Sequence, residues 1–314
     1  MELATMVIDQ KGTMLDLFSK DVLQVCYLNG SKRKVGLRGL SRLIIYGQAQ
    51  VSSGLLRNCF DCGVSVVLLP GRGQQEAVHC FPPSAGNATL RINQFKAHLD
   101  QSMCLKLAQF RVLEKFNQQK LCLNKCGIAA DFSQYVQHSE RVVDHAELLG
   151  VEGSGSAYYF SLWKQLWTKP WLFEGRNRRP PRDEVNSLLS LSYTLATSKV
   201  GQVLTSHGLD LQAGFLHRVR SNRPSLALDV LEAVRPHIDY WVWCFLSSGA
   251  VKPADFSHSQ KDGVRLKKES RSVFYQHWYH DQAEEILPVI EASVAIFIKQ
   301  LKKINYKPEE GCLL

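Results

Sequence analysis

Short apolar runs separated by turn-forming residues characterise the first 80 residues. Residues 22–28 are mostly apolar and end at Asn29-Gly30, a dipeptide typical of two-residue β-hairpins. The return run, residues 31–37, carries three basic residues, as a solvent-facing strand would. Residues 64–69 form an apolar run that ends at Pro70-Gly71. The pattern predicts a small, mainly β domain over residues 1–80.

A helical period of 3.6 residues replaces these short runs from about residue 90 onward. It covers six stretches: residues 90–123, 133–148, 154–167, 184–201, 225–246 and 282–303. Residues 81–89 contain Pro82, Pro83 and Gly86 and are typical of a linker. We therefore expect an α+β chain, in which the small β domain and the linker precede a larger all-α domain over residues 90–314.

The overall charge is the first hint of a partner. The chain has 38 basic and 29 acidic residues, a formal charge of +9. Such an excess favours polyanionic partners such as DNA, although it also occurs in merely basic proteins. No apolar run approaches the roughly 20 residues that cross a bilayer, and residues 1–21 lack a signal-peptide pattern. We expect a cytoplasmic protein without a membrane partner, whose nine cysteines are reduced thiols.

Two isolated polar residues stand out in the helical part. Glu152 lies among small residues where a helix is expected to begin; it is either a cap that complements the helix dipole or a group that a bulky ligand can approach. His217 lies in a glycine-containing loop, where it is either simply exposed or close to phosphate. The second interpretation rests on Arg218, Arg220 and Arg223, whose guanidinium groups match phosphate oxygens.

A pair of acids occurs on an otherwise apolar helix. Asp229 and Glu232 are three residues apart and share one helix face. They either form a solvated strip that pairs with Arg235, or they are buried and need a cation to neutralise them. With Glu152 and His217 they would make a cage suited to Mg²⁺ or Mn²⁺, the ions that phosphoryl chemistry on DNA requires.

The order and spacing of these segments resemble the CRISPR adaptation integrase, the spacer-acquisition endonuclease numbered first among the CRISPR-associated (Cas) proteins. The resemblance covers the chain's general plan and is carried by four motifs: Glu152-Gly153 with small residues after it, Gly208-Leu209-Asp210 followed by Gly214-Phe215-Leu216-His217, Ser225-Leu226-Ala227-Leu228-Asp229, and Arg235-Pro236. It implies that Glu152, His217 and Glu232 are catalytic metal ligands and that Asp229 supports them. Whether His217 is a ligand or a proton carrier stays open.

The resemblance also implies partners and a reaction. The protein would form a homodimer through its β domain and combine with the small, second-numbered Cas protein. Together they would insert a short prespacer duplex into a CRISPR repeat by attack of a 3′-hydroxyl on a repeat phosphodiester. Metal-dependent DNA cleavage would use the same site.

Basic residues outside the site are candidates for contacts with the DNA backbone, which position a duplex without reading its sequence. They fall in three segments: Arg176, Arg178 and Arg179; Arg218, Arg220 and Arg223; and Lys267, Lys268 and Arg271. Two other functions remain open from the sequence, a non-catalytic DNA-binding scaffold subunit and a stand-alone nuclease that repairs branched DNA.

Overall fold

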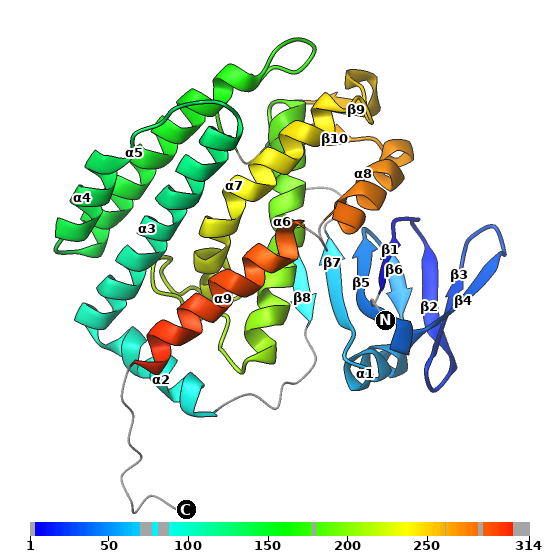
Figure 1. The fold of residues 1–314 in the computed structure, drawn as a ribbon. Helices are drawn as coiled ribbons and strands as arrows, with labels where there is room; N and C mark the ends of the chain where they lie inside the picture. The colour runs from blue at the N-terminus through cyan, green and yellow to red at the C-terminus, as the bar shows by residue number, and fades with distance from the viewer. Residues whose placement is uncertain are drawn as a thin grey trace, which may run out of the picture. The chain divides into compact units, whose positions relative to one another are not determined.

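The computed structural model describes residues 4–69, 77–80, 88–177, 180–260, 262–281 and 285–303, and the chain divides into two compact units, Met1–Ser84 and Ala85–Leu314. The first unit is rich in strands and the second in helices (Figure 1). This order confirms the predicted fold class. Most of the expected linker, residues 81–87, lies outside the described residues.

Two four-stranded sheets form the first unit. One has the order β1-β5-β7-β8 and the other the order β4-β3-β2-β6. Helix α1 (Ser53–Asp61) packs against β2 and β7. The strand bounds are β1 Ala4–Ile8, β2 Thr13–Ser19, β3 Val22–Cys26, β4 Lys32–Gly36, β5 Leu40–Tyr46, β6 Ala49–Val51, β7 Ser65–Leu69 and β8 Val78–Cys80.

The hairpin predicted at Asn29-Gly30 is confirmed. Strands β3 and β4 pair antiparallel, and the amide of Tyr27 donates to the carbonyl of Ser31 across the turn. Gly30 has a φ of +81°, a left-handed conformation that glycine adopts without steric cost. Apolar residues from both sheets and α1 form one core between them, with Leu23 and Leu43 fully buried.

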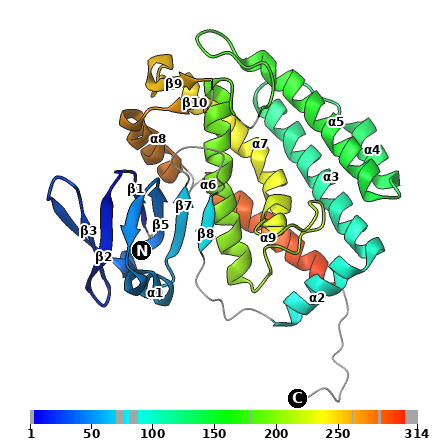
Figure 2. The same cartoon turned by 180° about the vertical axis from the view of Figure 1, so that it is seen from behind.

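Helices form most of the second unit. Their bounds are α2 Ala88–Leu99, α3 Gln101–Lys125, α4 Ser133–Arg141, α5 His145–Trp163, α6 Glu184–Ser206, α7 Ser225–Ser247, α8 Lys268–Asp281 and α9 Leu287–Lys302. Helix α7 packs against α3, α6 and α9, and α5 lies beside α3 with α4 next to it (Figure 2). None of the described helices is long and apolar enough to span a bilayer.

Aspartate N-caps explain where several helices begin. The side chains of Asp100, Asp144 and Asp183 each accept a hydrogen bond from an amide in the first turn of α3, α5 and α6. The helical period over residues 90–123 predicts one continuous stretch, but the cap at Asp100 separates α2 from α3. The cap at Asp144 likewise begins α5 upstream of the expected start near Glu152, so that expectation was wrong.

One hairpin interrupts the helical unit, which was expected to be all-α. Strands β9 (Phe256–Ser259) and β10 (Gly263–Leu266) pair antiparallel. Gly263, with a φ of +71°, lies where β10 begins, and the amide of Val264 donates to the carbonyl of Pro181. The four-residue strands carry too little alternation to be recognised from sequence.

Candidate active site

Helix α7 places the predicted pair of acids, Asp229 and Glu232, in the protein interior. Asp229 is 0% exposed and Glu232 is 3% exposed. The solvated-strip interpretation of this pair is therefore excluded. The two carboxylates nevertheless have different partners. Asp229 contacts the loop that precedes α7, whereas Glu232 contacts Lys115 of α3 and Arg235 of α7 and lies near His217.

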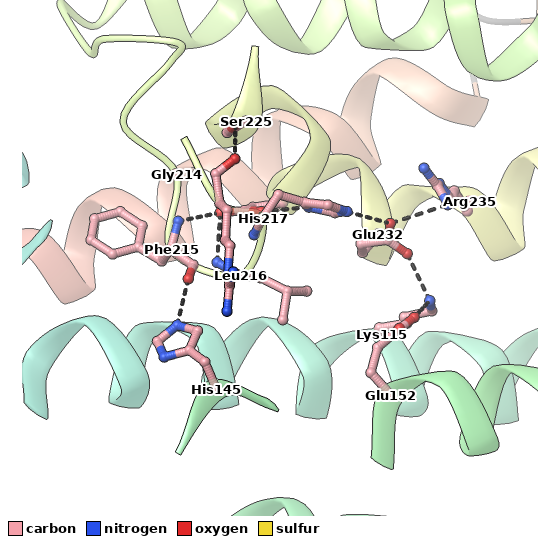
Figure 3. A network of polar contacts seen from close by, with 12 residues as sticks. Lys115, His145, Glu152, Gly214, Phe215, Leu216, His217, Ser225, Glu232 and Arg235 are labelled. Carbon is pink, nitrogen blue, oxygen red and sulfur yellow. Dashed lines mark hydrogen bonds and ion pairs between the residues drawn. The ribbon is translucent and has the colours of Figure 1, made fainter. Parts of the chain in front are cut away.

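Asp229 holds the loop that carries His217. Its carboxylate accepts hydrogen bonds from the backbone amides of Phe215 (2.5 Å), Leu216 (3.0 Å) and His217 (2.9 Å). It also contacts His217 Nδ1 at 2.7 Å. An imidazole that donates from Nδ1 keeps Nε2 as its basic nitrogen. This nitrogen points toward Glu232, 3.8 Å from Oε1 (Figure 3).

Side chains from α2 and α5 hold the same loop from the other side. His98 Nδ1 lies 2.8 Å from the carbonyl of Gly214, and His145 Nε2 lies 2.8 Å from the carbonyl of Phe215. The amide of Gln94 donates to two more loop carbonyls. The position of His217 is therefore fixed by contacts with three helices, and none of these partners is close to it in sequence.

Glu152 is the eighth residue of α5 and is not a helix cap. The small residues around it are part of the helix, and Gly155 allows close packing against α3, since a Cβ there would lie 2.4 Å from the Phe116 ring. The Glu152 carboxylate accepts a hydrogen bond from Ser156 and pairs with Lys115 of α3. Helices α5 and α7 thus bring Glu152 and Glu232 to one lysine.

Two cations contact Glu232, and the imidazole of His217 lies close to it. Lys115 Nζ lies 2.7 Å from Oε2, and Arg235 Nη1 lies 3.1 Å from Oε1. Burial opposes ionisation, but Arg235, Lys115 and His217 together hold the pKa of Glu232 well below its usual range. The carboxylate is therefore ionised and can bind a cation.

A third buried acid, Asp239, lies further along α7. Asp239 accepts hydrogen bonds from the hydroxyls of Tyr159 (3.0 Å) and Tyr193. Burial raises its pKa to about 6, although both tyrosine hydroxyls act in the opposite direction. The guanidinium of Arg235 stacks over the Tyr193 ring at 4.9 Å, so this cluster also helps to orient the arginine beside Glu232.

A pocket of about 550 Å³ opens beside Glu152. It is lined by basic and aromatic side chains that include Lys115, Lys164, Arg176, Arg235 and Tyr193. Positive charge and ring surfaces next to the acids suit a nucleotide phosphate and base.

The chemistry of these donors fits a divalent cation, although their side chains are not arranged as a closed cluster. Among the described residues, no three His, Cys, Asp or Glu side chains converge closely enough for a metal ion. Two ionised carboxylates nonetheless face one cation, the Lys115 ammonium. Glu232 Oε2 has the Lys115 ammonium 2.7 Å away, so a metal ion at this oxygen would have to take the place of the ammonium. Carboxylate oxygens with a nearby imidazole are suitable ligands for Mg²⁺ or Mn²⁺.

The basic residues predicted to contact DNA have different surroundings. Arg218, Arg220, Lys267 and Lys268 are exposed, whereas Arg223 and Arg271 are half-buried. Arg176 is also half-buried and donates to Asn186 and Ser190. Arg178 and Arg179 lie outside the described residues.

Sequence reasoning missed Lys115, Asp239 and the two loop-holding histidines. A signal existed for Lys115, because Arg111, Lys115 and Gln119 recur every four residues among apolar neighbours on α3. All three are at least 95% buried. A buried polar stripe of this kind needs partners from other helices. The histidines carry no comparable signal, since their partners are backbone carbonyls of a distant loop.

Comparisons with known proteins agree on one family. The profile of the family described as CRISPR associated protein Cas1 matches residues 6–280. The chain is 37% identical over 245 residues to CRISPR-associated endonuclease Cas1 3 of Thermus thermophilus, which covers 77% of this chain and 73% of the relative. It is 31% identical over 302 residues to CRISPR-associated endonuclease Cas1 1 of Chlorobaculum tepidum, with 90% and 88% covered.

Solved structures share the fold at lower identity. A Cas1 protein from Thermotoga maritima superimposes with a TM-score of 0.87 at 20% identity and covers 98% of this chain and all of its own. A casposase bound to its integration product has a TM-score of 0.86 at 21% identity, with 97% and 92% covered. A chain of a Cas6-RT-Cas1–Cas2 complex has a TM-score of 0.76 at 20% identity, with 96% and 35% covered.

Proposed function

Since the chain belongs to the CRISPR-associated Cas1 family, we propose that it is a divalent-metal-dependent DNA endonuclease and integrase of CRISPR adaptation. The observation that carries the proposal is the meeting of Glu152 and Glu232 at one buried cation, next to the basic nitrogen of His217. Two carboxylates and an imidazole beside a pocket suit phosphodiester chemistry.

Glu152, Glu232 and His217 would hold the metal, Mg²⁺ or Mn²⁺. A cation bound there would polarise the scissile phosphate and stabilise charge on the attacking or leaving oxygen. Arg235 neutralises part of the negative charge that Glu232 brings to the site. Asp229 is a positioning residue, because all its described contacts go to the histidine loop.

His217 has a second possible role in the same reaction. Because Asp229 takes the Nδ1 position, Nε2 is available either to bind the metal or to accept the proton of an attacking 3′-hydroxyl or water. Attack by the 3′-hydroxyl would join a DNA end to the repeat by transesterification, whereas attack by water would cleave the strand.

The proposed substrates are a short prespacer duplex and the CRISPR repeat. The pocket beside Glu152 supports a nucleotide at the site, and the exposed basic residues Arg218, Arg220, Lys267 and Lys268 would hold the phosphate backbone. The similar casposase is bound to an integration product, and the similar chain of the RT-containing complex assembles with Cas2. By analogy with these two proteins, we propose that this chain binds DNA together with the small Cas2-type protein. A homodimer formed through the strand-rich unit completes the proposed assembly.

A strand-transfer assay tests the function. The purified protein, with and without its small partner, is mixed with a labelled short duplex and a supercoiled plasmid that carries a repeat array. Reactions contain Mn²⁺, Mg²⁺ or EDTA. We expect joined products only with a divalent metal, and their loss in Glu152→Gln, His217→Gln and Glu232→Gln. The exposed acid of α9 provides the matched control, Glu291→Gln, which keeps activity.

The outcomes separate the alternatives. Salt-sensitive DNA binding without joining or cleavage under any metal would identify a scaffold subunit and refute the proposal. Cleavage of branched DNA without any joining to the repeat would instead identify a repair nuclease, which uses the same residues on another substrate.

A further inference from the structure

Lys115 occupies a position that a resident metal would also require. Its ammonium contacts Glu152 Oε1 from α5 and lies 2.7 Å from Glu232 Oε2 of α7 (Figure 3). These are the two carboxylates to which the proposed function assigns the metal. The lysine is 5% exposed, so its charge depends on these two acids for stabilisation.

The site is electrically balanced by the chain's own residues. Glu152 and Glu232 contribute two negative charges, and Lys115 and Arg235 contribute two positive charges in direct contact with them. A divalent cation between the same carboxylates would meet an ammonium within a few ångströms. Like charges repel strongly in such a buried place, because little water screens them. The ammonium and the divalent cation therefore exclude each other.

The lysine has somewhere to go when it leaves. Lys115 lines the pocket of about 550 Å³ beside Glu152, and Gln119 lines the same pocket one turn further along α3. Gln119 is 2% exposed, and its Oε1 atom has no hydrogen-bond partner among the residues described. A buried amide oxygen without a donor is costly, and an ammonium that moved into the pocket could satisfy it.

We propose that Lys115 is an internal cation that holds Glu152 and Glu232 together in the metal-free protein and moves into the adjoining pocket when a divalent cation binds. The inference rests on the proposed function, because it assumes that these acids bind the metal. It assigns to Lys115 the role of a competitor that lowers the apparent metal affinity and keeps the empty site folded.

Calorimetric titration with Mn²⁺ tests the competition without measuring activity. Lys115→Met removes the competing charge and is expected to tighten Mn²⁺ binding by at least about tenfold. The matched control is Lys164→Met. Lys164 lines the same pocket, but it pairs with the exposed Glu174 and does not contact the acids. Its substitution should leave Mn²⁺ affinity within about twofold of the wild type.

Amine labelling of the wild type tests the movement itself. A small acetylating reagent followed by peptide mass spectrometry should modify Lys115 slowly in EDTA and several-fold faster in saturating Mn²⁺. This measurement needs no substitution, so it applies even where Lys115→Met fails to fold without metal. In that case Lys115→Gln, which keeps a polar group, provides the titration.

Each outcome bears on a distinct claim. If the wild type binds Mn²⁺ and Lys115→Met binds it equally well or more weakly, the proposed role of Lys115 is overturned and the metal site stands. Labelling of Lys115 that Mn²⁺ does not accelerate does the same. If neither the wild type nor Lys115→Met binds Mn²⁺, the metal site of the proposed function fails, and the inference fails with it. Binding by Lys115→Met alone supports the inference.

Discussion

The carboxylate of Asp229 offers the sharpest test of how the site is built. Its two oxygens accept four contacts, three from backbone amides and one from His217 Nδ1, all between 2.5 and 3.0 Å. The substitution Asp229→Asn keeps the shape but exchanges one oxygen for an NH₂ group. The remaining amide oxygen can accept about two of the four hydrogen bonds, and the NH₂ group faces donors.

The expected loss of stability follows from these contacts. Each buried donor left without an acceptor costs about 1–3 kcal/mol, and the remaining bonds lose their charge assistance. The substitution should therefore lower the free energy of unfolding by about 3–5 kcal/mol. His217 loses its fixed orientation as well. Strand transfer should fall roughly 10–100-fold, as is typical when an outer carboxylate of a metal site is removed.

Urea unfolding followed by tryptophan fluorescence measures the first effect. All six tryptophans lie in the helical unit, so the signal reports on the part of the chain that holds the site. The matched control is Asp210→Asn in the same loop. Asp210 is half-buried and accepts two amide hydrogen bonds through one oxygen, which asparagine can also do. Asp210→Asn should lower the free energy of unfolding by less than about 1 kcal/mol. Equal stability and full activity of Asp229→Asn would refute the account of the loop.

Three further predictions concern single positions. Gly214→Ala should reduce strand transfer about 10–100-fold, because its Cβ would lie 2.7 Å from the backbone of the first residue of α7 and displace the histidine loop; an unchanged rate would contradict this. Gly155→Ala should destabilise the helical unit by about 1–3 kcal/mol through collision with Phe116, whereas Gly153→Ala, which meets open space, should stabilise it by up to about 1 kcal/mol. Because burial raises the pKa of Asp239 to about 6, the folded state binds the proton of Asp239 more tightly than the unfolded state does. As pH rises from 4 to 7, the free energy of unfolding of the wild type should therefore fall by up to about 3 kcal/mol relative to that of Asp239→Asn. A difference between the two proteins that stays constant with pH would rule this out.

The sequence carried much of the fold because its local signals were strong. Asn29-Gly30 specified a hairpin, and long stretches of helical period specified most of the helices. The break at Asp100 and the start of α5 at His145 were missed, because aspartate caps are weak signals beside an apolar period. The small residues near Glu152 suggested the start of a helix, whereas they lie inside α5, where Gly155 allows close packing against α3.

The candidate site, like the fold, could be predicted from the sequence only in part. The spacing of Asp229 and Glu232 identified a shared helix face, and the structure shows both acids buried. The spacing did not indicate that Asp229 contacts a loop and Glu232 a lysine. The lysine comes from α3, and side chains of α2 and α5 hold the loop. These contacts depend on tertiary packing, which the spacing of two acids on one helix does not encode. Their roles as metal ligands and positioning groups stay predictions.

The central claim is that Glu152, Glu232 and His217 form a divalent metal site. Anomalous diffraction from crystals that contain Mn²⁺ tests it most directly, since the signal locates the metal without reference to activity. The account predicts a single strong peak within coordination distance of both carboxylates and His217 Nε2, with the Lys115 ammonium moved away from it. A peak bound elsewhere in the helical unit, or no peak near these three side chains at saturating Mn²⁺, would contradict the claim.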